Sequence, residues 1–107
     1  MSMLPVAFLG DSRDRLRDFP TEMREECGRI IRRLQRGLSP SDWKPFPQIG
    51  PAVREFRVWG EDGTFRVFYT VKTADAVYVL HAFQKKAQQT PQKDIDLAIR
   101  RYREIGR

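Results

Sequence analysis

The sequence contains little of what a disulfide-stabilised or metal-bound protein needs. Among its 107 residues there is one cysteine, Cys27, and one histidine, His81. A single cysteine cannot form an internal disulfide, and no cysteine and histidine residues stand at the spacing of a zinc site. We therefore expect a protein of the reducing cytoplasm, with no metal ion and no cofactor.

Export and membrane signals are also missing. The apolar residues of positions 1–10 follow no basic segment and precede no small-residue cleavage site, unlike those of a signal peptide. No apolar segment reaches the roughly 20 residues that a transmembrane helix requires. The sequence predicts no membrane partner.

Common catalytic motifs are absent as well. The chain has no glycine-rich phosphate loop, no Ser/His/Asp set in a known order and no paired carboxylates of metal-binding type. Any phosphoryl chemistry is therefore expected to be metal-free.

What the chain has is basic charge, carried mostly by arginine. The net charge is +6, and 15 of the 20 basic residues are arginine. The planar guanidinium presents a fork of donors that matches phosphate oxygens, whereas lysine acts as a point charge. The composition favours a polyanionic partner; a well-solvated surface of an arginine-rich protein is the alternative.

The length and the hydrophobic periodicity predict one α+β domain over residues 1–107. The element order is β-α-α-β-β-β-α, with a mainly antiparallel sheet packed by helices on one face, while the other face is left open. The proline-rich segment Ser39–Pro51 shows no period and is predicted to be a surface loop. Strands are expected at Pro5–Leu9, Val53–Trp59, Thr64–Val71 and Val77–Phe83, and helices after Asp11, from Thr21 to the stop at Gly37, and from Pro91 to Tyr102.

Two arginines project from neighbouring predicted strands. Period-two alternation places Arg57 on the same face as Glu55, and Arg66 on the same face of the next strand as Phe68. Because arginine is seldom buried alone, each must pair with an acid such as Glu55 or face a solvent-filled concavity. If they share one concavity they form a phosphate clamp; otherwise they are polar residues of a wet sheet face.

The segment Leu80–Pro91, LHAFQKKAQQTP, joins the last strand to the last helix through two lysines. A helix N-terminus beside them favours phosphate binding. His81 shares a strand face with Val79 and Phe83, so it is either a satisfied, half-buried histidine or a catalytic one. The tyrosines are either packing residues or stacking platforms for bases.

Taken in order, REFR, FRVFY and LHAFQKKAQQTP followed by DIDLAIRRY resemble the HigB-like, phage-derived branch of the RelE/ParE toxin superfamily. The resemblance runs from about Phe19 to Ile105. It implies a RelE-like domain that acts as a toxin of a type II toxin-antitoxin pair. The implied activity is a metal-independent endoribonuclease, or mRNA interferase, that cleaves ribosome-bound mRNA. The implied partner is a cognate antitoxin, expected to carry a helix-turn-helix DNA-binding portion.

The resemblance also implies the site residues. In the RelE-type reaction a ribose 2′-hydroxyl attacks its adjacent phosphate, which requires a base, an acid and cations around the phosphorane. Arg57 and Arg66 are expected to stabilise charge. Lys85 or Lys86 is the base if neighbouring cations and partial burial lower its pKa, and His81 is the alternative base. The residues expected to bind RNA are Tyr69, Phe83, Arg101 and Tyr102.

Two other functions remain open at this stage. One is a gyrase inhibitor of the ParE type, which would cause DNA damage signalling without cutting RNA. The other is a non-catalytic nucleic-acid-binding protein of phage origin, in which basic residues hold phosphate with a steep salt dependence.

Overall fold

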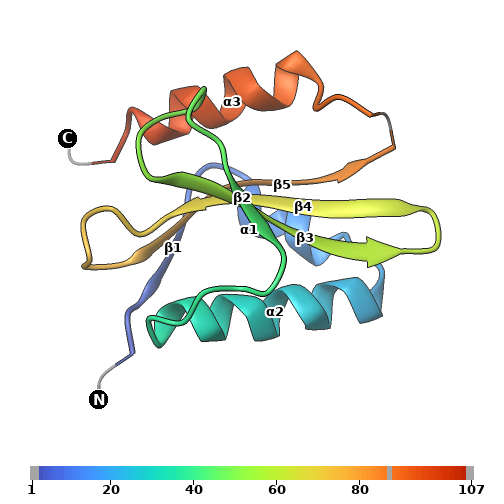
Figure 1. Ribbon diagram of the computed structural model, residues 1–107, viewed down its shortest axis with the longest axis horizontal. Helices are drawn as coiled ribbons and strands as arrows, with labels where there is room; N and C mark the ends of the chain where they lie inside the picture. The colour runs from blue at the N-terminus through green and yellow to red at the C-terminus, as the bar shows by residue number, and fades with distance from the viewer. Residues whose placement is uncertain (1–2, 87, 106–107) are drawn as a thin grey trace.

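The computed structural model describes residues 3–86 and 88–105 and shows a central sheet between helices (Figure 1). The strands follow the order β1-β5-β4-β3-β2, in which only β1 and β5 are parallel. The predicted α+β class and the mainly antiparallel sheet are confirmed. The elements are β1 (Val6–Phe8), α1 (Ser12–Arg17), α2 (Thr21–Gln35), β2 (Trp43–Pro45), β3 (Val53–Gly60), β4 (Gly63–Thr70), β5 (Val77–Lys85) and α3 (Gln92–Tyr102).

The first core lies between the sheet and the helices α1 and α2. Cys27, Ile31 and Leu34 recur at helical spacing and form the buried stripe of α2. They pack against side chains such as Phe56 and Val67, which point to one face of β3 and β4. This is the core that the hydrophobic period of α2 predicts.

The second core lies on the opposite face, under α3. Ala98 of α3 is fully buried and belongs to a cluster with Val53, Phe68 and Leu80. The prediction that helices cover one face only is therefore wrong in this detail, since α3 and α2 lie on opposite sides of the sheet (Figure 1). The reason is that β3 and β4 carry large apolar side chains at both odd and even positions, so both faces require cover.

The segment Ser39–Pro51 is more ordered than predicted. It contains the edge strand β2, in which Trp43 pairs with Phe56 of β3. Phe46 and Ile49, which follow β2, are buried in the second core. A three-residue strand that ends in proline shows no measurable alternation in a sequence, and an edge position tolerates proline because no ladder bond is lost there.

A bulge in β5 changes which residues face which core. Phe68 of β4 lies opposite His81, but its neighbour Tyr69 lies opposite Val79, so Leu80 is an extra residue in β5. Val79 consequently belongs to the first core, whereas His81 hydrogen-bonds to α3 on the other face. The expectation that His81 shares a face with Val79 was wrong.

Within residues 3–86 and 88–105, the helices are too short or too polar to cross a membrane.

Candidate active site

Cross-strand register gathers basic side chains on one face of the sheet. Arg57 of β3 lies opposite Arg66 of β4, and Thr64 of β4 lies opposite Lys85 of β5. Residues paired across antiparallel strands point to the same face, as do residues two apart along one strand. Arg57, Arg66 and Lys85 therefore share the face on which Phe68 enters the second core.

A buried carboxylate, that of Glu55, holds Arg66 in place. Glu55 is 0% exposed, and its Oε1 accepts a hydrogen bond from Arg66 Nη1 at 2.7 Å. Lys44 Nζ of β2 lies 3.9 Å from the same oxygen, and Thr64 Oγ1 accepts a bond from Arg66 Nε at 3.1 Å. The other oxygen, Oε2, makes no hydrogen bond with the described residues. Since removing one partner of a buried ion pair is strongly unfavourable, Glu55 fixes the guanidinium of Arg66.

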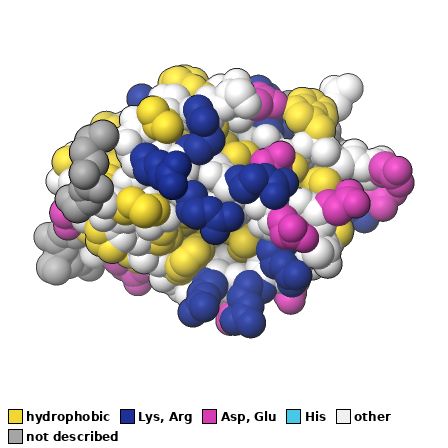
Figure 2. Space-filling model, turned by 90° about the horizontal axis from the view of Figure 1, so that it is seen from below, with side chains coloured by type: hydrophobic (Ala, Val, Ile, Leu, Met, Phe, Trp, Pro, Cys, Tyr) yellow, Lys and Arg dark blue, Asp and Glu magenta, His cyan; other side chains and the backbone are white. Residues whose placement is uncertain are grey.

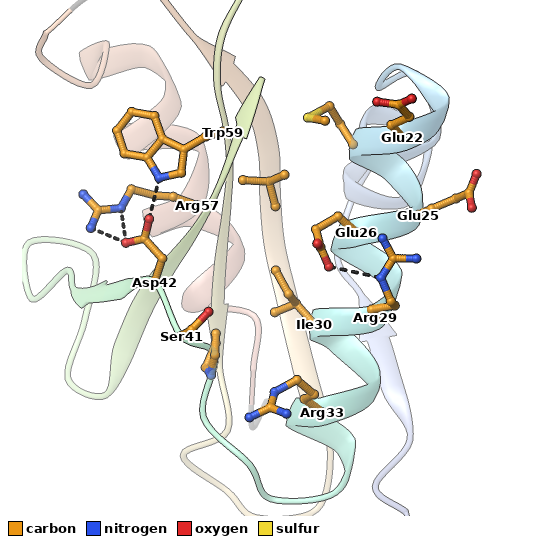
Figure 3. A pocket seen from close by; sticks show the side chains of 13 residues that line it. Glu22, Glu25, Glu26, Arg29, Ile30, Arg33, Ser41, Asp42, Arg57 and Trp59 are labelled. Atoms are coloured by element: carbon orange, nitrogen blue, oxygen red, sulfur yellow. Dashed lines mark hydrogen bonds and ion pairs between the residues drawn. The ribbon is translucent and has the colours of Figure 1, made fainter. Parts of the chain in front are cut away.

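A second carboxylate, that of Asp42, holds Arg57 (Figure 3). Its Oδ1 accepts hydrogen bonds from Arg57 Nε at 3.0 Å and Nη2 at 2.5 Å, and its Oδ2 accepts one from the Trp59 indole at 2.6 Å. Burial alone raises the pKa of Asp42, but the bonds from Trp59 and Arg57 outweigh it and leave that pKa below its usual value. Asp42 is thus ionised at neutral pH and orients Arg57.

Lys85 lies at the end of β5 and is only 8% exposed. Its pKa is lowered from the usual value, mainly because burial disfavours the charged ammonium, and further because Arg66 and Lys44 are positively charged. Glu55 opposes this shift. Lys85 therefore gives up its proton more readily than an ordinary lysine.

The residues around Glu55 form what we call the basic cluster. Four cations outnumber two carboxylates, so the cluster keeps positive charge even with its ion pairs formed. Each guanidinium carries five N–H donors, and the ion pairs use only some of them. The side chains of Lys44 and Arg57 are 40% and 25% exposed and can contact a phosphate directly, whereas Arg66 and Lys85 are only 6% and 8% exposed and add positive potential from beneath the surface. The members are Asp42, Lys44, Glu55, Arg57, Arg66 and Lys85.

The other site residues predicted in and just after β5 lie beside the cluster or beneath α3. Lys86 follows the strand and is exposed. Phe83 lies opposite Arg66 but is buried, with its ring centroid 5.3 Å from that of Phe68. His81 is 1% exposed, and its Nε2 lies 2.7 Å from Asp94 Oδ1 of α3.

His81 is consequently a poor base for a bound RNA. Burial lowers its pKa, although the hydrogen bond with Asp94 raises it in part. Its ring also stacks on that of Phe83, at 5.3 Å between centroids. Of the two roles left open for His81, the buried and hydrogen-bonded one fits this environment.

The remaining residues predicted to bind RNA serve the packing of the fold. Tyr69 is 1% exposed within the first core, on the face away from the basic cluster. Arg101 donates to the carbonyl of Leu80 at 2.9 Å and to Asp11. Tyr102 donates to the carbonyl of Pro51 at 3.1 Å. The structure therefore brings together Arg57, Arg66 and Lys85, but not Tyr69, Arg101 or Tyr102.

Sequence reasoning missed Asp42 and Lys44. Both stand in the proline-rich segment, which has no period from which the orientation of a side chain could be read. Only the pairing of Lys44 with Glu55 across β2 and β3 reveals their place. In the part of the chain that the structure describes, no group of three or more histidine, cysteine, aspartate or glutamate side chains could hold a metal ion.

Residues 14–103 match the family model described as Phage derived protein Gp49-like (DUF891). That range contains β2 to β5, α2 and α3, and hence the whole basic cluster. A search of the curated proteins finds no match.

Proposed function

The chain belongs to the phage-derived Gp49-like family, and from this premise we propose that it is the toxin of a type II toxin-antitoxin system of the RelE/ParE superfamily. In this proposal it is a HigB-like mRNA interferase that cleaves ribosome-bound mRNA in the cytoplasm without a metal ion. The proposal depends on one observation above all. Arg57, Arg66 and Lys85, which come from three strands, converge on one face around a buried glutamate.

The reaction proposed is an internal transesterification of RNA. The 2′-oxygen attacks the adjacent phosphorus, the bond from phosphorus to the 5′-oxygen breaks, and a 2′,3′-cyclic phosphate and a 5′-hydroxyl end result. The 2′-hydroxyl loses a proton and the leaving 5′-oxygen gains one, so protons balance. The phosphorane between them carries more negative charge on its oxygens than the substrate does.

Each cluster residue has a part in this reaction. Arg57 and Arg66 donate to the phosphorane oxygens from positions held by Asp42 and Glu55, so little reorganisation is needed as charge develops. Neutral Lys85 accepts the proton of the 2′-hydroxyl, which its lowered pKa favours. Solvent supplies the proton of the 5′-oxygen.

A free nuclease of this kind would cleave the mRNA of the cell that produces it, so its activity must be inhibited there. We therefore include a cognate antitoxin in the proposal, with a helix-turn-helix DNA-binding portion and encoded beside this chain. By covering the basic cluster it would block access of RNA.

The test is controlled expression followed by mapping of RNA ends. Expression of the chain should stop growth and produce new mRNA 5′ ends inside coding regions. Lys85→Met removes the amine but keeps the shape of the side chain. Arg66→Met combined with Glu55→Gln removes both members of the buried pair, so no unpaired charge is left behind. Both variants should restore growth and abolish the new ends.

A matched control is Arg103→Ala. Arg103 directly follows α3, is exposed, and makes no side-chain hydrogen bond with the described residues. This variant should remain as toxic as the unmodified chain. If both cluster variants fold, as judged by circular dichroism, and are still as toxic as the unmodified chain, the basic cluster is not the active site. DNA damage signalling without cut mRNA would instead identify a gyrase inhibitor, and harmless expression a non-catalytic binding protein.

A further inference from the structure

A groove runs between α2 and the end of β3, next to the basic cluster (Figure 3). Its two connected parts measure ≈ 810 Å³ and ≈ 710 Å³ and share Glu22, Met23 and Trp59 in their linings. One wall is α2 from Thr21 to Arg33, and the other is formed by Asp42, Trp59 and the β3–β4 turn. This volume suffices for several side chains of a partner.

The floor of the groove is apolar. Met23 and Ile30 of α2 face Val58 and Trp59 of β3 across it. Trp59 is 65% exposed, the most exposed large apolar side chain described. β2 pairs with β3 only at residues 54–56. Among the described strands, none pairs with the outer edge of β3 at Trp59. Exposed tryptophan in a concave apolar setting is characteristic of protein interfaces.

The rim of the groove is acidic, although the protein as a whole carries +6. The basic residues of the lining are already engaged: Arg57 pairs with Asp42, Arg29 pairs with Glu26, and Arg33 donates to a backbone carbonyl. Figure 2 shows acidic side chains gathered toward one end of the face seen from below, beside basic side chains over its middle. Six acidic residues and three arginines line the groove: Glu26 and Asp42 are paired with Arg29 and Arg57, and the other four acidic residues are Glu22, Glu25, Glu61 and Asp62.

We propose that this groove binds a segment of a partner protein that presents apolar side chains flanked by lysine or arginine. The apolar side chains would cover Met23, Ile30 and Trp59, and the basic ones would pair with the acidic rim. Charge complementarity selects this occupant, because the rim repels the phosphates of RNA and repels an acidic peptide. The identification of this partner as the antitoxin rests on the proposed function. The inference that the groove binds a basic, apolar segment does not depend on that function.

Occupation of the groove would also reach the basic cluster. Asp42 accepts the indole N–H of Trp59 with one oxygen and the guanidinium of Arg57 with the other. A partner that moves Trp59, or that draws Asp42 toward its own cation, therefore alters the position of Arg57. This is a direct physical connection between partner binding and the proposed phosphate site.

The test uses a synthetic amphipathic helical peptide of leucine and lysine, with a leucine and glutamate peptide of equal length for comparison. Binding to the full chain is measured by calorimetry. The lysine peptide should bind despite the net positive charge of the protein, and the glutamate peptide should not compete with it. Trp59→Ala should weaken binding at least about tenfold, as for a residue central to an interface.

Charge reversal with a matched control tests the acidic rim. Glu26→Lys with Glu61→Lys should weaken binding of the lysine peptide at least about tenfold. Asp96→Lys with Glu104→Lys makes the same change of net charge at exposed positions outside the groove lining and should leave binding within about twofold. Loss of the exposed Glu26–Arg29 pair affects folding little.

The outcomes separate this inference from the proposed function. If the lysine peptide fails to bind, or binds equally to both charge-reversed proteins and to Trp59→Ala, the groove is not such a site. Preferential binding of the glutamate peptide or of an RNA oligonucleotide in the groove overturns it equally. Growth arrest and mRNA cleavage are measured without any peptide, so their failure affects only the proposed nuclease.

Discussion

At the scale of single residues, the basic cluster depends on how its charges are held. Arg66 and Glu55 are both buried, and a buried ion pair offers little net stability relative to apolar side chains. Its presence is better explained by the orientation that it gives to a guanidinium. Lys85 differs from Arg66 because its described surroundings include no carboxylate within ion-pair distance. Its proton is more easily lost than that of an ordinary lysine.

The first prediction concerns the pH dependence of Lys85. Only the neutral amine accepts a proton, so the cleavage rate should rise with pH, and the lowered pKa should place the midpoint below the ordinary lysine value of 10.5. The measurement is kcat/KM on a model RNA between about pH 6 and 9, with spontaneous hydrolysis subtracted. Lys85→Met should give a flat, slow profile.

Lys93→Met is the control, because Lys93 is an exposed lysine of α3 outside the basic cluster. Its profile should match that of the unmodified chain. A rise with pH that survives in Lys85→Met would assign the proton transfer to another group.

At the scale of elements, α3 is attached to the start of α1 through Arg101. Its guanidinium bonds to Asp11 and to the carbonyl of Leu80, and it lies directly over Gly10. The hydrogen bonds from Arg101 and Arg15 lower the pKa of Asp11 to about 2. Gly10 has φ +54°, a conformation that favours glycine, and a Cβ there would overlap the Arg101 guanidinium. Arg101, which was predicted to bind RNA, thus holds α3 against β5 and the start of α1.

The second prediction is that Gly10→Ala destabilises the protein by about 2–3 kcal/mol, through backbone strain and displacement of Arg101. Urea unfolding followed by circular dichroism measures this. Gly28→Ala is the contrasting change, since Gly28 lies inside α2 and an added Cβ meets only Arg32 Nη2 at 4.0 Å. It should raise stability by about 0.5–1 kcal/mol. Equal effects at both positions would contradict the contact with Arg101.

The strands also show which features of the site can be predicted from the sequence. Alternation in β3 and β4 gave each arginine a face of its own strand but left open whether Arg57 and Arg66 share one; the cross-strand register puts both on one face with Lys85. The period of a strand, however, gives no sign of a bulge such as that at Leu80. Nor does it reveal which carboxylate outside the strands approaches a given arginine, as Asp42 does. Such facts depend on tertiary packing rather than on local pattern.

At the scale of the whole molecule, charge is divided between faces. The basic cluster lies on the face that α3 shares, while further exposed arginines line α2, which covers the opposite face. Figure 2 shows these basic side chains over α2. Net charge alone therefore does not tell which face binds RNA. If RNA binds at only one of the two basic surfaces, only substitutions on that surface should weaken RNA binding.

The last prediction distinguishes those two faces by salt dependence. Binding of a 2′-O-methyl RNA, which lacks the attacking hydroxyl, should weaken with salt because each neutralised phosphate of a single strand contributes a slope of about 0.7 in log Kd against log salt. Arg57→Met removes a charged donor whose side chain is 25% exposed, and should reduce the slope by about one such contact. Arg36→Ala, at the exposed C-cap position that follows α2, should leave the slope unchanged. If Arg36→Ala lowers the slope as much as Arg57→Met does, RNA is held by general positive charge rather than at the basic cluster, and the placement of the reaction there fails.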